Sequence, residues 1–209
     1  MKRFLTGIPL QGKGMLERYV YEAAGNERLA MAEGTAFPII TAVNGYVGSG
    51  EEFGVVAVCP DSEDGRRNLR LLEDELQALC ARKGCVCKAL ATVPAQRSEH
   101  VSDHTAVFQK LIDHVEENDE LFACLTFGTK PQSQVLLMAV QYAYRVKRNT
   151  SVACILYGQV DRSAGRDPAD WRACVYDETA LLQLDEIVRV LAERKVSDPK
   201  AVIDGILKL

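Results

Sequence analysis

The chain has 209 residues and a formal net charge of −4 at pH 7, with 25 Lys and Arg against 29 Asp and Glu. A chain of this length buries enough surface to fold as one domain without disulfides or metals. The acidic balance argues against a general nucleic-acid binder, because such proteins neutralise many phosphates and are usually basic. We therefore expect no direct DNA binding.

The seven cysteines are scattered, and several stand inside apolar runs such as 121–125. This pattern favours reduced thiols packed in a core. Cys85 and Cys87 are the only close pair, and no second pair or nearby His completes a tetrahedral zinc set, so we expect neither a structural metal nor a cofactor. The start of the chain lacks the apolar region of a signal peptide, and no run reaches the ~18 apolar residues of a membrane span. These features predict a cytoplasmic protein without a membrane partner.

Apolar runs of strand length alternate with helical patterns along the chain. The runs predict strands at 3–8, 54–59, 85–93, 121–126, 151–157 and 172–176. The periodic segments predict helices at 37–47, 61–83, 101–117, 132–147, 178–194 and 198–207. Asp61–Asp64 suits the start of the second helix, and Gly84 suits its end. Such alternation predicts right-handed crossovers and a parallel sheet covered by helices.

Two stretches interrupt this alternation. Residues 18–31 contain a turn at 24–26 and predict a small inserted hairpin. A polar loop at 162–168 separates the last long strand from a short strand and two helices. The predicted fold is therefore an α/β, Rossmann-like three-layer sandwich with a mainly parallel sheet, helices on both faces, an inserted hairpin and a C-terminal helical extension. We assign 1–160 to the Rossmann domain and 161–209 to a strand and helices packed on that same domain.

The segment 125–131 leaves a buried strand and enters a helix. Thr126 and Thr129 offer hydroxyls, and Gly128 lets the backbone approach a ligand closely. Pro131 suits the first turn of the helix, and Lys130 stands at its positive end. Backbone N–H groups, helix dipole and ammonium together predict an anion site, although a helix-capping turn alone would have the same residues. The P-loop spacing is absent.

Two further strand ends should meet this loop, because ligands of open α/β sheets bind at the carboxyl ends of the strands. The first strand ends in Thr6 and Gly7, and the strand that starts at Ser151 leads into Gly158 and Gln159. Together they would form a polar floor with one fixed cation. Three cations in other predicted loops could also reach an anion: Lys13, Arg162 and Arg166.

The sequence Thr126–Pro131 (TFGTKP), followed by Tyr142–Arg145 (YAYR) and Ile155–Gln159 (ILYGQ), resembles the CRISPR-associated Rossmann-fold (CARF) family. The likeness covers residues 1 to about 160 and is closest to type III CRISPR accessory proteins with a T-[FY]-G-T-K-P loop. It implies a homodimer whose symmetric cleft binds cyclic oligoadenylate, a second messenger of antiviral defence.

The resemblance also implies roles for individual residues. The implied ligand-binding set is Thr6, Gly7, Thr126, Phe127, Gly128, Thr129, Lys130, Gly158 and Gln159. In a ring nuclease that needs no metal, Lys130 would neutralise the phosphorane while Thr126 or Thr6 orients an oxygen.

Three alternatives stay open at this point. The chain could be a non-catalytic sensor that passes ring binding to a partner protein through its C-terminal helices. A flavodoxin-like or dinucleotide enzyme is disfavoured because no G-x-G-x-x-G follows the first strand. Arg97 and His104 match the spacing of a HEPN ribonuclease motif, yet they lie inside the Rossmann part, which favours a capping or solvent-exposed role.

Overall fold

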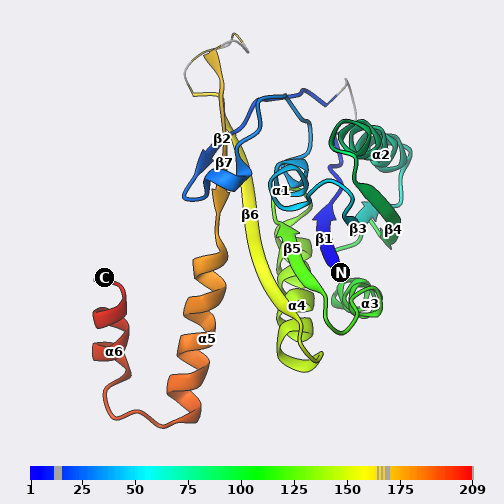
Figure 1. Ribbon diagram of the computed structural model, residues 1–209. Helices are drawn as coiled ribbons and strands as arrows, with labels where there is room; N and C mark the ends of the chain where they lie inside the picture. Colours follow the sequence, from blue (N-terminus) through cyan, green and yellow to red (C-terminus); the bar gives the residue numbers. More distant parts are fainter. Residues whose placement is uncertain (12–15, 164, 166, 168–169, 209) are drawn as a thin grey trace. The chain divides into compact units, whose positions relative to one another are not determined.

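The computed structural model describes residues 1–11, 16–163, 165, 167 and 170–208 (Figure 1). Contacts divide the chain into two units, Met1–Asp177 and Glu178–Leu209. The second unit contains helices α5 (Thr179–Glu193) and α6 (Pro199–Ile206). The division falls after the last strand, because that strand is hydrogen-bonded into the sheet of the first unit.

The first unit is built on a seven-stranded sheet in the order β2-β7-β6-β5-β1-β3-β4. The strands are β1 (Lys2–Gly7), β2 (Glu22–Ala24), β3 (Glu52–Pro60), β4 (Val86–Ala95), β5 (Glu120–Cys124), β6 (Ser151–Asp161) and β7 (Arg172–Asp177). Neighbouring strands are parallel throughout, except that β7 runs antiparallel to β6. The predicted α/β fold with a mainly parallel sheet is confirmed.

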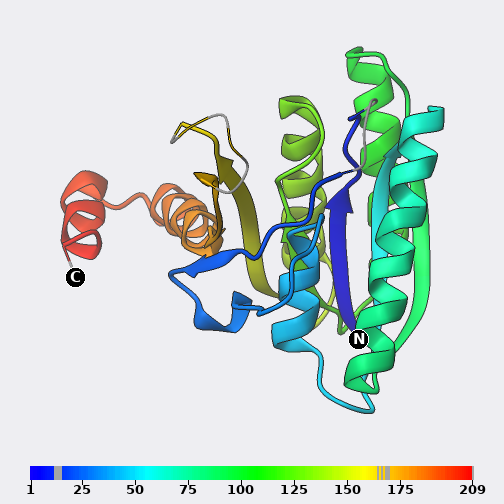
Figure 2. The same ribbon diagram turned by 90° about the horizontal axis from the view of Figure 1, so that it is seen from above.

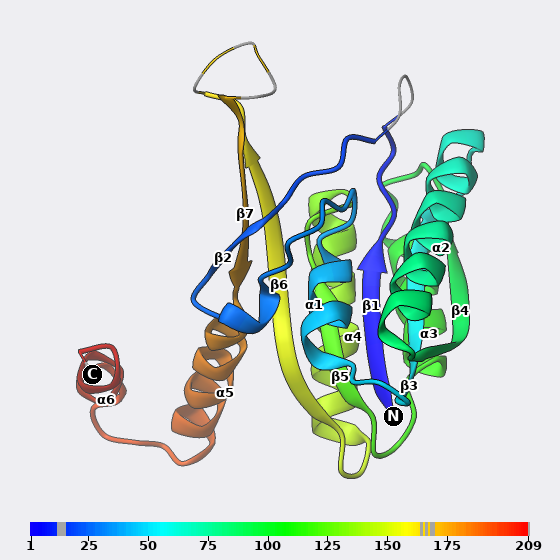
Figure 3. The ribbon, with the colours of Figure 1, turned by 45° about the horizontal axis from the view of Figure 1, so that its top comes forward.

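Two pairs of helices cover the two faces of this sheet (Figures 2 and 3). One face carries α1 (Ile39–Tyr46) and α2 (Glu63–Lys83), and the other carries α3 (Val101–Asp113) and α4 (Lys130–Val146). Under α1 and α2 the core is aromatic: Phe4 stacks on Phe122 at 4.4 Å between ring centroids and meets Phe53 edge-on at 5.6 Å. The three layers follow because strands buried on both faces need apolar cover on each.

The order in which the strands are added reverses at β1. From β1 the chain passes through α1 to β3 and then β4, whereas from β5 it passes through α4 to β6 on the other side. The connections after β1 and β5 therefore leave toward opposite faces, as Figure 3 shows. In open α/β sheets this topological switch point is where ligands bind.

The predicted hairpin at 18–31 is wrong. Its strand β2 pairs in parallel with β7, with Glu22 opposite Cys174 and Ala24 opposite Tyr176. The turn does exist, with Gly25 at φ 79°, but it leads into a 3₁₀ helix (Glu27–Leu29) instead of a returning strand. Strand β7 pairs with β6 on one side, and its other side is free to pair with β2. This pairing joins residues about 150 positions apart, so the local sequence around β2 does not indicate it.

Two predicted boundaries also change. The strand expected to end at Tyr157 continues as β6 to Asp161, because β7 pairs with its second half. Helix α3 ends at Asp113 instead of near residue 117, and Asp119 Oδ2 accepts the backbone N–H of Glu116 in the turn that follows. Of the helices described, none is both long and apolar enough to cross a bilayer.

Candidate functional site at the carboxyl ends of the strands

The loops after β1 and β5 touch at the switch point, backbone against backbone. A Cβ placed on Gly7 would lie 2.5 Å from the carbonyl oxygen of Phe127 and 3.6 Å from the nitrogen of Gly128. Only glycine allows this approach, since real Cβ atoms do not come so close to a backbone atom. The structure thus joins two of the segments that the sequence placed at one edge.

The loop after β5 ends in a capped helix start. Thr129 is the N-cap of α4, and its backbone N–H donates to Gln132 Oε1 at 3.1 Å. Gly128 has φ 105°, a conformation that L side chains rarely adopt. Lys130 is the first residue of α4 and its side chain is exposed. Its ammonium therefore adds to the positive end of the helix dipole, and within the described residues no side chain forms an ion pair with it.

The two threonine hydroxyls predicted to contact a ligand have partners inside the protein. Thr6 is 1 % exposed, and its Oγ1 donates to the carbonyl oxygen of Gly7 at 3.2 Å. Thr126 Oγ1 accepts the N–H of Gly158 at 2.7 Å and lies 3.2 Å from Cys124 Sγ. Thr126 is half-buried, and either atom of its contact with Cys124 can be the donor, whereas the Thr6 side chain is buried.

Gly158 and Gln159 lie in the middle of β6, not in a loop. A Cβ on Gly158 would meet Pro38 Cγ at 2.3 Å, so this glycine lets the chain before α1 pack on the strand. Gln159 is exposed and points to the other face of the sheet, because successive residues of a strand alternate. The structure therefore places Gly158 in contact with Thr126, whereas the side chain of Gln159 lies on the opposite face of the sheet.

A cavity of about 320 Å³ opens beside Thr126, Phe127 and Gly158. Phe127 also packs edge-on against Phe37 at 6.0 Å between ring centroids. Arg162, which the sequence offered as a cation within reach of an anion, also lines this cavity. The rest of the lining was not indicated by the sequence: Gln11, Leu16, Glu17, Tyr19, Tyr21, Ala36 and Val160. Only tertiary folding brings Gln11 and the segment 16–36 over this edge.

The lining of that cavity includes the rings of Tyr19 and Tyr21 and the Arg162 side chain, and Trp171 contacts Tyr19 and Arg162 from outside the lining. The Arg162 guanidinium lies 4.6 Å from the centroid of the Trp171 ring, and the rings of Tyr19 and Tyr21 are 6.3 Å apart. Burial and a hydrogen bond to Glu17 raise the pKa of Tyr19, although Arg162 opposes the shift. Burial also raises the pKa of Tyr21. Both phenols are therefore neutral at physiological pH, and the wall can stack on a planar group.

Glu99 and His104 lie near the start of α4. Glu99 belongs to the connection between β4 and α3, and His104 belongs to the first turn of α3. Glu99 Oε2 accepts from Thr129 Oγ1 at 3.3 Å and lies 3.2 Å from His104 Nε2. Through Glu99, His104 is thus connected to the loop after β5. The sequence, which offered His104 only as a possible partner of Arg97 in a HEPN motif, did not predict this connection. The Glu99 carboxylate therefore lies beside the N-cap residue of α4.

The structure defines a class of fold: an open α/β sheet with its topological switch point at β1 and β5, the position where sheets of this class bind ligands. Comparison with models of known families finds no match, and no curated protein matches the sequence. Among the described residues no group of three or more His, Cys, Asp or Glu side chains is arranged to hold a metal ion. Lys13 and Arg166 lie outside the described residues.

Proposed function

We propose that this chain is a CARF-like protein of type III CRISPR defence that binds cyclic oligoadenylate at the carboxyl ends of β1 and β5. One observation carries the proposal: the Gly7 and Phe127 backbones close on each other at the switch point, beside the exposed Lys130 at the start of α4. Such a helix start binds phosphate through its N–H groups and its dipole. The adjoining aromatic cavity suits a planar base.

We further propose that the bound ring is cleaved. A ribose 2′-oxygen attacks the neighbouring phosphorus, the bond from phosphorus to the 5′-oxygen breaks, and the products carry a 2′,3′-cyclic phosphate and a 5′-hydroxyl. Lys130 neutralises the charge that develops on the phosphorane. Thr126 orients a phosphate oxygen, and the proton of the attacking 2′-hydroxyl passes to the 5′-oxygen that leaves.

The proposed assembly is a homodimer. One sheet edge presents a single Lys130 and a single aromatic cavity, whereas a cyclic oligonucleotide repeats the same phosphate and base around its ring. Two copies related by a two-fold axis would offer the same groups to both halves of the ring.

A ligand panel tests the proposal. Cyclic tri-, tetra- and hexa-adenylate are added to the purified chain, with linear oligoadenylates of equal length as controls, and thermal unfolding is followed. A ring that binds only the native state stabilises it by ~2.7 kcal/mol at a hundredfold excess over Kd. No shift with any ring rejects the proposed function.

The same samples separate enzyme from sensor. After incubation, chromatography of the nucleotides is expected to show linear products with 2′,3′-cyclic phosphate ends. A ring that stabilises the protein but is recovered intact would instead favour the sensor, in which α5 and α6 contact a partner. Exposed apolar side chains on these helices, such as Leu181 of α5 and Ile206 of α6, are the observation that supports this alternative.

A further inference from the structure

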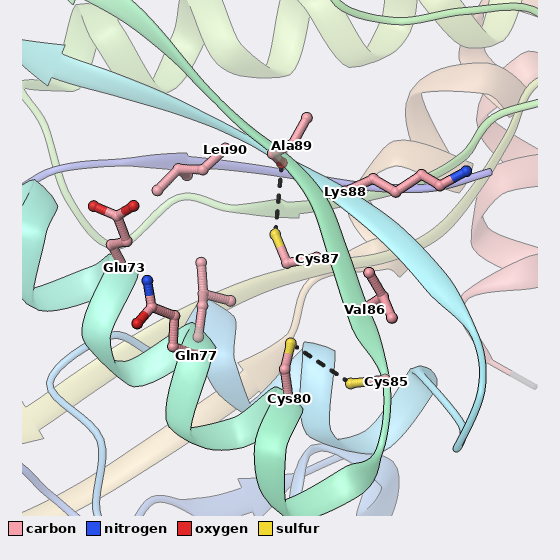
Figure 4. Close-up of a pocket in the computed structure, with 10 residues that line it drawn as sticks. Glu73, Gln77, Cys80, Cys85, Val86, Cys87, Lys88, Ala89 and Leu90 are labelled. Carbon is pink, nitrogen blue, oxygen red and sulfur yellow. Dashed lines mark hydrogen bonds between the residues drawn. The ribbon is translucent and has the colours of Figure 1, made fainter.

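A second cavity, of about 360 Å³, lies between α2 and the edge strand β4 and is lined by three cysteines (Figure 4). Cys80 lies in the last turn of α2. Cys85 directly precedes β4, and Cys87 is the second residue of that strand. This is the amino end of β4, opposite the edge where the proposed ligand binds. The cavity thus belongs to a different part of the sheet, and the proposed function does not use its thiols.

Cys80 and Cys85 are held together by the way α2 ends. Gly84 adopts φ 67° and donates its N–H to the carbonyl oxygen of Cys80 at 2.8 Å, and the N–H of Cys85 reaches the same oxygen at 3.3 Å. This is the arrangement of a Schellman cap, in which the residue after the glycine packs on the residue five positions earlier. The two sulfur atoms are 3.7 Å apart as a result.

Cys87 is directed differently. Its Sγ donates to the carbonyl oxygen of Ala89 at 3.6 Å, and Figure 4 marks this bond separately from the contact between Cys80 and Cys85. Cys85 is 6 % exposed, and Cys80 is half-exposed toward the cavity. An oxidant therefore meets Cys80 first and finds Cys85 directly behind it.

We propose that Cys80 and Cys85 are a modification site, a dithiol that forms a reversible disulfide with a low-molecular-weight disulfide as oxidant. The Cys80 thiolate attacks one sulfur of the oxidant, giving a mixed disulfide and releasing one thiolate. The Cys85 thiolate then attacks Cys80 Sγ, the mixed disulfide breaks, and a second thiolate leaves. Two protein thiols are oxidised and lose two protons, while one oxidant disulfide is reduced to two thiols.

The surroundings of the pair determine how fast it reacts. Burial, followed by the hydrogen bond to Cys85, raises the pKa of Cys80 to about 11. The charged groups that line the cavity are Glu73 of α2 and Lys88 of β4, which have opposite signs. Because the thiolate is the nucleophile, oxidation is expected to be slow at pH 7 and about tenfold faster for each unit of pH up to about pH 9.

Peptide mapping tests the proposal on the wild-type chain. The native protein is incubated with oxidised glutathione at pH 8.5, remaining thiols are blocked with N-ethylmaleimide, and the sample is digested with trypsin without reductant. Arg82 and Lys83 stand between the two cysteines, so cleavage there separates Cys80 from Cys85 and Cys87. A disulfide between Cys80 and Cys85 links peptide 71–82 to peptide 84–88, with the maleimide on Cys87.

The expected result is this cross-link in about tenfold excess over any other cysteine pair, and its loss after dithiothreitol. Cys80→Ser and Cys85→Ser should abolish it, whereas Cys174→Ser, on β7, should leave it unchanged. Glutathione adducts without the cross-link, or a cross-link through Cys87, would overturn the assignment. Ring binding plays no part in the readout, so this result and that of the ligand panel are independent.

Discussion

The two edges of the parallel sheet handle charge in opposite ways. At the amino edge the charged groups neutralise one another: Asp119 is 1 % exposed, its Oδ1 lies 3.1 Å from the amino group of Met1, and its Oδ2 lies 3.0 Å from Arg3 Nε. At the carboxyl edge Lys130 is exposed at a helix start, and the only acid described near that start is Glu99, which bonds Thr129 and His104. The first arrangement stabilises the fold, and the second leaves an exposed cation, to which we assign an anionic ligand in the proposed function.

The contrast shows that the contribution of a charged side chain depends on its burial and on the charged groups that pair with it. A buried carboxylate needs its full set of partners, because one uncompensated charge in the interior is costly. A solvated ammonium at a helix start costs little to maintain and gains energy when a phosphate arrives. Four substitutions test this comparison, from the largest expected effect to the smallest.

Asp119→Asn should lower the free energy of unfolding by about 3–5 kcal/mol, because the Arg3 guanidinium, 9 % exposed, would lose its counter-charge. Urea unfolding measures this loss. Glu117→Gln is the matched control: it removes an exposed pair with Arg148 and should cost less than about 1 kcal/mol. Equal losses in the two variants would show that burial of the Asp119 carboxylate adds nothing to the stability its ion pairs supply.

Lys130→Ala should lower ring cleavage by about 10²–10³, the usual cost of one electrostatic stabiliser, while the unfolding midpoint stays unchanged. Lys130→Arg should not restore the rate, since a planar fork does not replace a compact ammonium. Turnover assays and calorimetric titration measure these effects, with Lys110→Ala, an exposed lysine of α3, as control. Binding and cleavage at wild-type levels would reject the assignment of Lys130.

Gly7→Ala should lower the free energy of unfolding by about 1–3 kcal/mol, because the new methyl group would push the loops after β1 and β5 apart. Ring binding should weaken with it. Gly205→Ala in α6, where nothing lies within 4 Å, should change stability by no more than about 1 kcal/mol and leave binding intact. Gly7→Ala with unaltered unfolding would show that the loops are not in contact.

Glu99→Gln should raise ring affinity by about two- to fivefold, since it removes a negative charge from the start of α4. Titration of the two proteins with the same ring measures the change. Glu73→Gln, at the cysteine cavity of the opposite edge, should bind as the wild type does. Weaker binding by Glu99→Gln would mean that the carboxylate holds the site in shape instead of opposing the ligand.

Local sequence signals predicted most of the fold. The apolar runs gave the strands of the parallel core, and helix α2 begins after Ser62, whose hydroxyl accepts from Gly65, and ends at Gly84, as its capping residues indicated. The errors fall where pairing is remote in sequence: β2 on β7, and the second half of β6. In both cases the neighbouring strand β7 determines that the segment is a strand and where it ends, and the segment's own sequence does not.

The sequence by itself determined that a Gly-Thr-Lys segment follows a buried strand and opens a helix, because strand, turn and helix signals are local. Tertiary structure alone decided that Gly7 touches Phe127, that Thr126 bonds Gly158, and that Gln11 and the segment 16–36 line a cavity beside them. It also brought Glu99 and His104 to Thr129. Contacts of this kind depend on the order of strands in the sheet, and that order is set by packing among segments far apart in the chain.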